Sequence, residues 1–214
     1  GMYIEYFFNG QISVIKSYQC NLLVGNFLEY YENGSLQSSV SYYNGSKHGK
    51  QLIYYPNSNI CKILNYKYGF PHGKWYTYYD NDFRTIKTFD HFFYGKHINR
   101  STTYYENNTI KSIINYNNKG QRNGVCKRFF ENQQIKYTKY YKDDKLHGET
   151  IEYYHNGNKK RILYHLDGKL NGTVFKYSLN NELEYKCHYI DNKRHGYSYE
   201  SVSYTHLTLP TTRL

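Results

Sequence analysis

The chain has 214 residues, a formal net charge of +11, and a composition with 30 tyrosines and a single methionine. A basic surface favours anionic partners such as nucleic acid or acidic lipid, but the positive residues are spread over the whole length and also fit an ordinary solvated surface. No run of about 18 apolar residues occurs, so the sequence predicts no transmembrane segment.

A glycine marks a repeat along nearly the whole chain. Starting from Gly1, it recurs at intervals of 24 residues, except between Gly73 and Gly124. Before Gly196, an aromatic residue follows each of these glycines after five positions and an asparagine after eight. The same spacing places a further copy at Asn99, where the glycine is absent, so residues 1–200 hold eight copies and the start of a ninth. A fixed period in this range is typical of repeat arrays.

Each copy predicts two short β-strands and two turns. The first strand follows the glycine, as in residues 74–79, and is rich in aromatic and β-branched residues. It ends at an Asn-Gly-like step, which predicts a tight hairpin with positive φ at both turn residues. The second strand, as in residues 60–66, closes with a second turn such as Asn44-Gly45. The next repeat glycine comes four residues later and is expected to begin the next hairpin.

In chain order, the predicted hairpin tips lie at Asn9, Asn33, Asn57, Asn81, Asn107, Asn132, Asn156 and Asn180. The glycines expected at structural turns are Gly25, Gly49, Gly73, Gly124, Gly148, Gly172 and Gly196. The predicted fold class is therefore all-β: an elongated repeat array of antiparallel β-hairpins that forms a single-layer meander of about 17 strands.

One face of this sheet is expected to be aromatic. Side chains alternate across a strand, so the residues three and five positions after each glycine share a face. The candidate binding residues assigned to it are Tyr30, Tyr54, Trp75, Tyr76, Tyr78, Tyr104, Phe129, Tyr153 and Tyr177. Two interpretations remain open: a stripe that holds neighbouring hairpins together, since aromatic residues are enriched in strands, or a groove that docks a partner segment.

The repeat unit, x-H-G-x-x-x-x-Y-Y-x-N-G followed by x-x-Y-x-D/N-G-K, resembles the variant MORN repeat, most clearly in the copies from Gly49, Gly73 and Gly148. The resemblance implies an elongated antiparallel sheet of successive hairpins used for protein contact or scaffolding. It also implies acidic-lipid association for MORN arrays in general and an antitoxin role for some bacterial variant-repeat proteins. The copy at Asn99 departs from the pattern because it lacks the glycine, and we expect a bulge or kink there.

The sequence offers no candidate catalytic residue, metal ligand or cofactor site. His48, His72, His147 and His195 each precede a repeat glycine, whereas a catalytic histidine would be singular, so they are interpreted as turn residues. The four cysteines have neither zinc-ligand nor repeat-matched spacing, which favours unpaired thiols in a reducing, cytoplasmic compartment. We therefore expect a protein that is not an enzyme and uses no cofactor.

The predicted function is that of a non-catalytic repeat scaffold that binds another protein through its aromatic face. One alternative is the binding of anionic partners, either single-stranded nucleic acid or an acidic lipid surface, by a basic aromatic sheet. Further alternatives are an antitoxin-like partner binder or a targeting module of a larger enzyme. Unpaired strands at the ends of the sheet also predict self-association.

The repeat reaches the first residue of the chain but stops before the last. The ninth copy runs in register from Gly196 to Glu200 and then loses the pattern. Residues 202–214 (VSYTHLTLPTTRL) resemble a translated sequencing adapter, and we expect residues 201–214 to form a non-native or disordered tail. Because Gly1 stands in repeat phase and is not an initiator methionine, we expect an array that is a fragment open at both ends.

Overall fold

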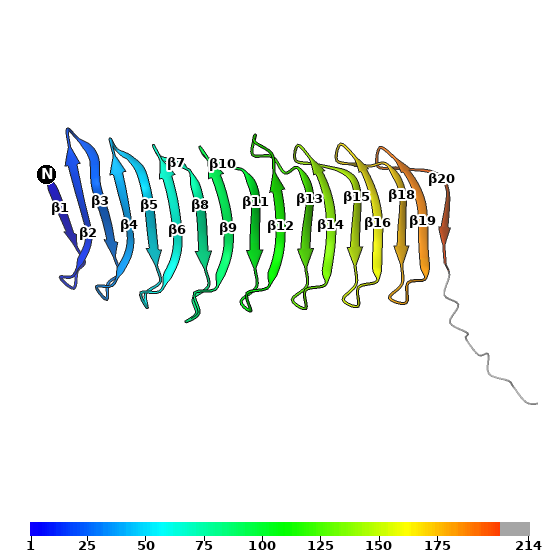
Figure 1. Ribbon diagram of the computed structural model, residues 1–214, viewed down its shortest axis with the longest axis horizontal. Helices are drawn as coiled ribbons and strands as arrows, with labels where there is room; N and C mark the ends of the chain where they lie inside the picture. Colours follow the sequence, from blue (N-terminus) through cyan, green and yellow to red (C-terminus); the bar gives the residue numbers. More distant parts are fainter. Residues whose placement is uncertain (202–214) are drawn as a thin grey trace, which may run out of the picture.

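The computed structural model describes residues 1–201, and within that range it contains 20 β-strands and no helix. The strands form one open sheet in which successive strands pair antiparallel along the chain, as Figure 1 shows. The predicted all-β array of antiparallel hairpins is thus confirmed. The segment that resembles a sequencing adapter, residues 202–214, lies outside the described residues.

The strands are β1 Met2–Tyr6, β2 Ile12–Gln19, β3 Leu22–Tyr30, β4 Leu36–Tyr43, β5 Ser46–Tyr54, β6 Ile60–Lys67, β7 Phe70–Pro71, β8 Gly73–Tyr78, β9 Ile86–Phe93, β10 Lys96–His97, β11 Asn99–Tyr104, β12 Ile110–Tyr116, β13 Gly124–Phe129, β14 Ile135–Lys142, β15 Lys145–Tyr153, β16 Lys159–Leu166, β17 Lys169–Leu170, β18 Gly172–Tyr177, β19 Leu183–Ile190 and β20 Lys193–Glu200. Three of them, β7, β10 and β17, have two residues each and resume after a one-residue break as β8, β11 and β18. The sheet therefore has 17 rungs once each broken strand is counted as one, in agreement with the prediction.

The turns at the predicted hairpin tips, which we call the asparagine turns, are longer than predicted. Between β3 and β4, the Gly34 amide donates a hydrogen bond to the Tyr31 carbonyl, and the Tyr31 amide donates to the Ser35 carbonyl, both at 2.9 Å. Gly34 has a positive φ of 81°, whereas Asn33 does not. The Asn33 Oδ1 instead accepts a hydrogen bond from the Ser35 amide at 3.0 Å. The prediction of positive φ at both residues was wrong because the asparagine closes a type I turn with its own side chain.

The turns at the opposite edge, which we call the two-residue turns, have the geometry predicted for the asparagine turns. Asn44 and Gly45 have φ values of 46° and 76° and lie between the paired residues Tyr43 and Ser46. Positive φ at both positions matches the right-handed twist of the strands. The other two-residue turns with this conformation are Cys20-Asn21, Tyr68-Gly69, Tyr94-Gly95, Asp143-Asp144, Asp167-Gly168 and Asp191-Asn192.

The repeat glycines do not form turns, which corrects the prediction. Gly49 lies inside β5, where the register shifts between the pairs Val40–Gln51 and Tyr42–Lys47, and its φ is 85°. A left-handed residue in a strand produces a β-bulge, and glycine adopts that conformation without a steric penalty. The others also have positive φ and either lie inside a strand or start one after a break: Gly25, Gly73, Gly124, Gly148, Gly172 and Gly196.

The histidines that precede the repeat glycines were also interpreted wrongly as turn residues. His48, His147 and His195 lie within β5, β15 and β20, and His72 lies in the break between β7 and β8. Because the glycine beside them forms a bulge and not a turn, each histidine remains in extended structure next to the neighbouring two-residue turn.

The copy without a repeat glycine follows the same path as the others. Asn99 has a φ of 61° and so takes the left-handed conformation itself, which asparagine tolerates better than most residues. The expected bulge is present, but every copy shares it. The repeat intervals before and after this copy are longer than 24 residues because two turns are enlarged. Seven residues separate the paired Tyr78 and Ile86, whereas five separate Tyr30 and Leu36. Residues 117–121 form the second enlarged turn.

The two faces of the sheet differ in polarity. On one face a row of mainly aliphatic and aromatic residues, which we call the central row, crosses all 17 rungs with each member paired to the next. It consists of Ile4, Ile15, Leu28, Ser39, Leu52, Ile63, Tyr76, Phe89, Thr102, Ile113, Lys127, Thr138, Ile151, Ile162, Phe175, Lys186 and Tyr199. On the opposite face, which we call the polar face, the adjoining row nearer the asparagine turns is more polar, with an Arg161–Glu152 ion pair at 2.6 Å and a Thr77–Thr88 hydroxyl bond at 2.7 Å. The adjoining row nearer the two-residue turns contains buried apolar side chains, namely Val40, Leu64, Cys126, Val174 and Cys187.

Candidate functional site

A ladder of tyrosine hydroxyls links successive copies near the asparagine turns. Each donor is the second residue of a Tyr-Tyr pair, and each acceptor is the backbone carbonyl of the aromatic residue five positions after the next repeat origin. The five bonds run from Tyr31 to Tyr54 at 2.7 Å and, at 2.9 Å each, from Tyr55 to Tyr78, Tyr79 to Tyr104, Tyr105 to Phe129 and Tyr154 to Tyr177. Sequence reasoning missed this role because the spacing identifies the pair but not the direction of its hydroxyl.

Further hydrogen bonds join the turns of neighbouring copies. At the asparagine turns, the Asn9 side chain donates to the Glu32 carbonyl at 3.0 Å. At the two-residue turns, the Gly45 amide donates to the Leu23 carbonyl at 2.9 Å. Both edges of the sheet are therefore held in register by contacts that recur from copy to copy.

Protonation supports the hydroxyl ladder at neutral pH. Burial, together with a hydrogen bond with the Cys61 thiol, raises the pKa of Tyr55 to about 12. Burial also raises the pKa of Tyr31 and of Tyr79. A phenol with a raised pKa keeps its proton and remains a hydrogen-bond donor over the physiological range.

Most residues of the predicted aromatic face do share one face. The rings of Tyr76 and Tyr78 stack at 6.4 Å, and those of Phe175 and Tyr177 stack at the same distance, as residues two positions apart in a strand should. Trp75 is the exception, because its ring contacts Phe92 at 4.6 Å on the opposite face. Alternation along β8 requires this, so its assignment to the aromatic face was wrong.

The remaining predicted residues form a half-buried row beside the asparagine turns. They are Tyr30, Tyr54, Tyr78, Tyr104, Phe129, Tyr153 and Tyr177, which pair with Leu36, Ile60, Ile86, Ile110, Ile135, Lys159 and Leu183. Except at Lys159, each aromatic residue of this row therefore has an aliphatic partner, and such cross-strand pairs stabilise a sheet. A binding role for these residues stays a prediction.

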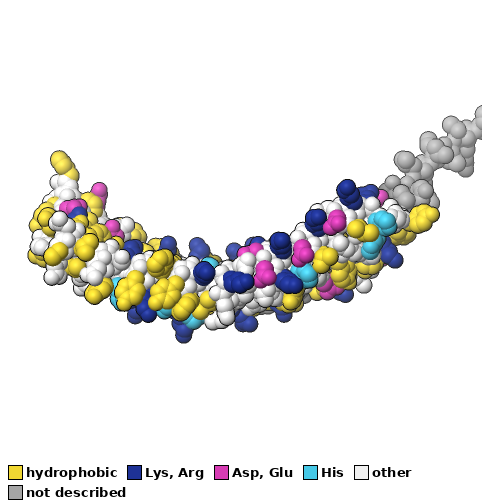
Figure 2. Space-filling view, turned by 90° about the horizontal axis from the view of Figure 1, so that it is seen from above, with side chains coloured by type: hydrophobic (Ala, Val, Ile, Leu, Met, Phe, Trp, Pro, Cys, Tyr) yellow, Lys and Arg dark blue, Asp and Glu magenta, His cyan; other side chains and the backbone are white. Residues whose placement is uncertain are grey.

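A cluster of exposed aromatic side chains lies on three consecutive two-residue turns, where the sequence analysis did not place a site. Its five members, called here the turn-edge patch, are Tyr43, Tyr68, Phe70, Phe93 and Tyr94, which are 41–56% exposed. His48 lies behind Tyr68 at 5.0 Å and His72 behind Tyr94 at 4.9 Å, measured between ring centroids. Figure 2 looks onto this edge and shows hydrophobic side chains with Lys and Arg between them over the N-terminal half of the array.

Two members of the patch occupy positions that disfavour large side chains. Tyr68 and Tyr94 have φ values of 50° and 45°, where the equivalent residues of other copies are Cys20, Asn44, Asp143, Asp167 and Asp191. The left-handed conformation costs an ordinary residue about 1 kcal/mol, and asparagine or aspartate reduces that cost. The sequence does carry a signal for this patch. It is the presence of a tyrosine at a turn position that is mostly Asn or Asp in the other copies.

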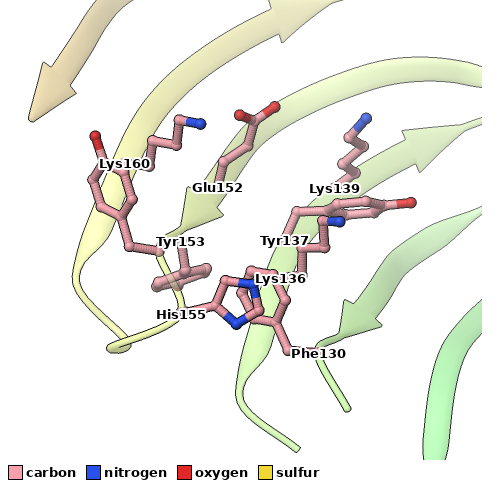
Figure 3. Close-up of a pocket in the computed structure, with 9 residues that line it drawn as sticks. Phe130, Lys136, Tyr137, Lys139, Glu152, Tyr153, His155 and Lys160 are labelled. Carbon is pink, nitrogen blue, oxygen red and sulfur yellow. The ribbon is translucent and has the colours of Figure 1, made fainter. Parts of the chain in front are cut away.

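A pocket opens on the polar face between two hairpins, next to the asparagine turns. It has a volume of about 390 Å³ and lies beside β14, β15 and β16. Figure 3 shows His155 lying across Phe130, with lysines and tyrosines around them. The two rings stack at a centroid distance of 3.7 Å. The other lining residues are Lys136, Tyr137, Lys139, Glu152, Tyr153, Tyr154 and Lys160.

The pocket coincides with a gap in the hydroxyl ladder. Phe130 stands where five other copies have the donor tyrosine, so it cannot donate to the Tyr153 carbonyl. Lys136 lies over the Phe130 ring at 5.3 Å and Lys160 over the Tyr154 ring at 5.4 Å. These contacts give the pocket an aromatic lining with a positively charged rim.

Residues 1–201 contain no group of three or more His, Cys, Asp and Glu side chains arranged to hold a metal ion. The same part of the chain contains no helix long and apolar enough to cross a membrane.

The fold and these surfaces define the class of protein: an elongated β-hairpin repeat protein that presents the faces and edges of one sheet. The model of the family described as "MORN repeat variant" matches residues 23–44, 47–68, 100–118, 122–143, 146–167 and 170–191, more than half of the chain. The chain belongs to this family. Its arrays generally serve as interaction or scaffold modules and are typically non-enzymatic.

Comparisons with individual proteins add little. No curated protein sequence matches the chain. Among solved structures, the crystal structure of TcdB2-TccC3-Cdc42 matches with 11% identity and a TM-score of 0.21 over 87% of this chain and 12% of the other. The crystal structure of TcdB2-TccC3 matches with 11% identity and a TM-score of 0.21 over 90% of this chain and 13% of the other. This likeness is too slight to support an argument about fold or function.

Proposed function

We propose that the chain is a non-catalytic scaffold that docks a protein segment on the turn-edge patch and the adjoining aromatic face. The segment carries apolar side chains flanked by acidic residues. The observation that supports this proposal best is the placement of Tyr68 and Tyr94 in left-handed turn positions. Residues that hold an unfavourable backbone conformation concentrate at functional sites, and exposed tyrosines give a large contact area at low entropic cost.

Continuity with the apolar face enlarges the docking surface. Tyr43 and Phe93 lie four residues beyond Ser39 and Phe89 of the central row along the same strands, so alternation places them on the same face. A segment lying across the patch therefore reaches the predicted aromatic residues of that face, including Tyr76 and Tyr78.

The charge beside the patch specifies the acidic flank. Lys67 lies over the Tyr94 ring at 5.5 Å, and Lys47 over the Tyr66 ring at 5.2 Å. Lys96 follows the Tyr94-Gly95 turn directly. None of the three lysines Lys47, Lys67 and Lys96 forms an ion pair with a carboxylate among residues 1–201. Complementary charge at an interface increases the association rate and the specificity.

Selection from a displayed random peptide library tests this proposal. The selected peptides should combine aromatic or aliphatic residues with Asp or Glu, and the double variant Tyr68→Asn/Tyr94→Asn should bind them at least about tenfold more weakly. Both changes install residue types used at this turn elsewhere in the chain, so folding should be retained and circular dichroism should be unchanged. The control, Tyr140→Asn, changes another exposed tyrosine outside the patch. Equal binding by the double variant, or selected peptides without acidic residues, would overturn the proposal.

Binding of an anionic polymer is the second candidate, supported by lysines on the polar face. Besides Lys136 and Lys160, Lys87 lies over Tyr79 at 5.3 Å and Lys111 over Tyr105 at 5.2 Å. Aromatic rings beside basic groups form a surface on which single-stranded nucleic acid stacks. Its affinity would fall steeply with added salt, whereas docking on the turn-edge patch would be less salt-dependent. Affinity for a homopolymeric oligonucleotide that survives at moderate salt would contradict the electrostatic basis of this second candidate.

A further inference from the structure

We propose that the pocket at Phe130 binds a free mononucleotide, with its planar base against the tyrosine rings and its phosphate beside the lysines. This site is separate from the turn-edge patch, because it lies on the other face of the sheet and next to the asparagine turns. The proposal stands independently of the docking function.

Three departures from the repeat pattern meet in this one pocket. Phe130 replaces the ladder tyrosine. Tyr137 occupies a polar-face position where the copies on either side have Ser112 and Arg161. His155 stands where the corresponding residues of other copies are mainly acidic, namely Glu32, Asp80, Glu106 and Glu131. Single changes of these kinds also occur elsewhere, at Phe7, Tyr185 and Leu179, whereas all three meet at this pocket.

The loss of the tyrosine hydroxyl frees a hydrogen-bond acceptor in the pocket. In five copies the equivalent carbonyl accepts a hydroxyl from the preceding copy, but Phe130 leaves the Tyr153 carbonyl without that donor. Tyr153 is one of the lining residues. An exocyclic amine or ring N–H of a nucleobase supplies the donor that this acceptor lacks.

The lysines of the pocket are available to an anion. Lys136, Lys139 and Lys160 form no ion pair with any carboxylate among residues 1–201. The one carboxylate in the lining, Glu152, is bound by Arg161 at 2.6 Å and its charge is thereby neutralised. The lining thus carries three uncompensated positive charges, and a lysine ammonium acts as a point charge toward phosphate.

The aromatic lining distinguishes a nucleotide from phosphate alone. Tyr137 and Tyr154 line the pocket together with the Phe130–His155 stack, and the volume of about 390 Å³ falls in the range of small-ligand sites. Base stacking on aromatic side chains contributes about 1–3 kcal/mol. Recognition of a phosphorylated protein side chain relies on arginine clusters, and no arginine is among the residues that line this pocket.

Isothermal titration of the full chain tests the proposal with four probes: adenosine monophosphate, adenosine, inorganic phosphate and phenyl phosphate. Adenosine monophosphate should bind at least about tenfold more tightly than each of the other three, because only it combines a nucleobase with the charge. Phe130→Tyr should weaken that binding at least about tenfold, because its hydroxyl restores the ladder bond to Tyr153. This variant returns to the pattern of the other copies, so a loss of binding would not reflect unfolding, and a thermal melt verifies that point.

The matched control is Lys111→Ala, which removes the equivalent lysine over Tyr105 one copy earlier, outside the pocket. It should leave nucleotide affinity unchanged, whereas Lys136→Ala should weaken it. The proposal is overturned if adenosine monophosphate does not bind, if Phe130→Tyr binds it as tightly as the unaltered chain, or if Lys111→Ala weakens it as much as Lys136→Ala. Equal or tighter binding of inorganic phosphate or phenyl phosphate would also overturn it, since the base would then contribute nothing.

Discussion

Removing a single hydroxyl from the ladder should produce a measurable loss of stability at one junction. In Tyr105→Phe, the bond to the Phe129 carbonyl, 2.9 Å long and part-buried, is lost, while Lys111 keeps an aromatic ring beneath it. An intramolecular hydrogen bond contributes about 0.5–1.5 kcal/mol net, and the carbonyl left behind is only partly shielded from water. We therefore expect the free energy of unfolding to fall by about 1 kcal/mol in urea titrations followed by circular dichroism, with an unchanged m-value.

The neighbouring residue provides the control. Tyr104→Phe makes the same chemical change one position earlier, on the opposite face, and should alter the free energy of unfolding by less than about 0.5 kcal/mol. Equal losses in Tyr104→Phe and Tyr105→Phe would refute the hydroxyl ladder as the origin of the effect. No loss in Tyr105→Phe would show that water satisfies both groups equally well.

Two other predictions concern pH and the bulges. The pKa of Tyr55 is raised from 10.0 to about 12 in the folded state, so the stability that this shift contributes is complete below pH 10 and is lost as the pH rises toward 12. Thermal melts at increasing pH should show this decline, and the decline should be shallower in Tyr55→Phe. Gly172→Ala should destabilise the array more than Gly49→Ala, since the added Cβ would lie 2.8 Å from the Tyr164 Cβ at the first site and meets nothing within 4 Å at the second. At Gly49 only the left-handed backbone resists the change, at a cost of about 1 kcal/mol, and equal losses at the two glycines would contradict this distinction.

The repeat period made the architecture predictable, because every copy imposes the same alternation and the same turn positions. The positions of the asparagine turns and the count of 17 rungs follow directly from the spacing of residues such as Asn33 and Asn57. The conformations at those positions did not follow. Asn-Gly fits two turn types, and the choice between them depends on the Asn33 side-chain bond to the Ser35 amide, which is a local contact that a motif does not specify.

The candidate surfaces were harder to predict for a different reason. The two tyrosines of each Tyr-Tyr pair cannot be told apart by residue type. Tyr104 and Tyr105 nevertheless lie on opposite faces, and only Tyr105 links two copies through its hydroxyl. The turn-edge patch arises from three turns that are 24 or 26 residues apart in sequence, and the pocket arises where Phe130 fails to do what its counterparts do. Sites of this kind are exceptions to the repeat, so a description of the average copy conceals them.

The hydrogen bonds between copies give the array a polarity. Beside the asparagine turns the ladder tyrosines donate forward, as Tyr31 does to Tyr54, whereas at the two-residue turns backbone amides donate backward, as Gly45 does to Leu23. The two ends of the sheet are therefore chemically unlike, and two chains that meet end to end reproduce both sets of bonds only when the last strand of one faces the first strand of the other. A contact of that kind joins two different surfaces and is not closed by a two-fold axis.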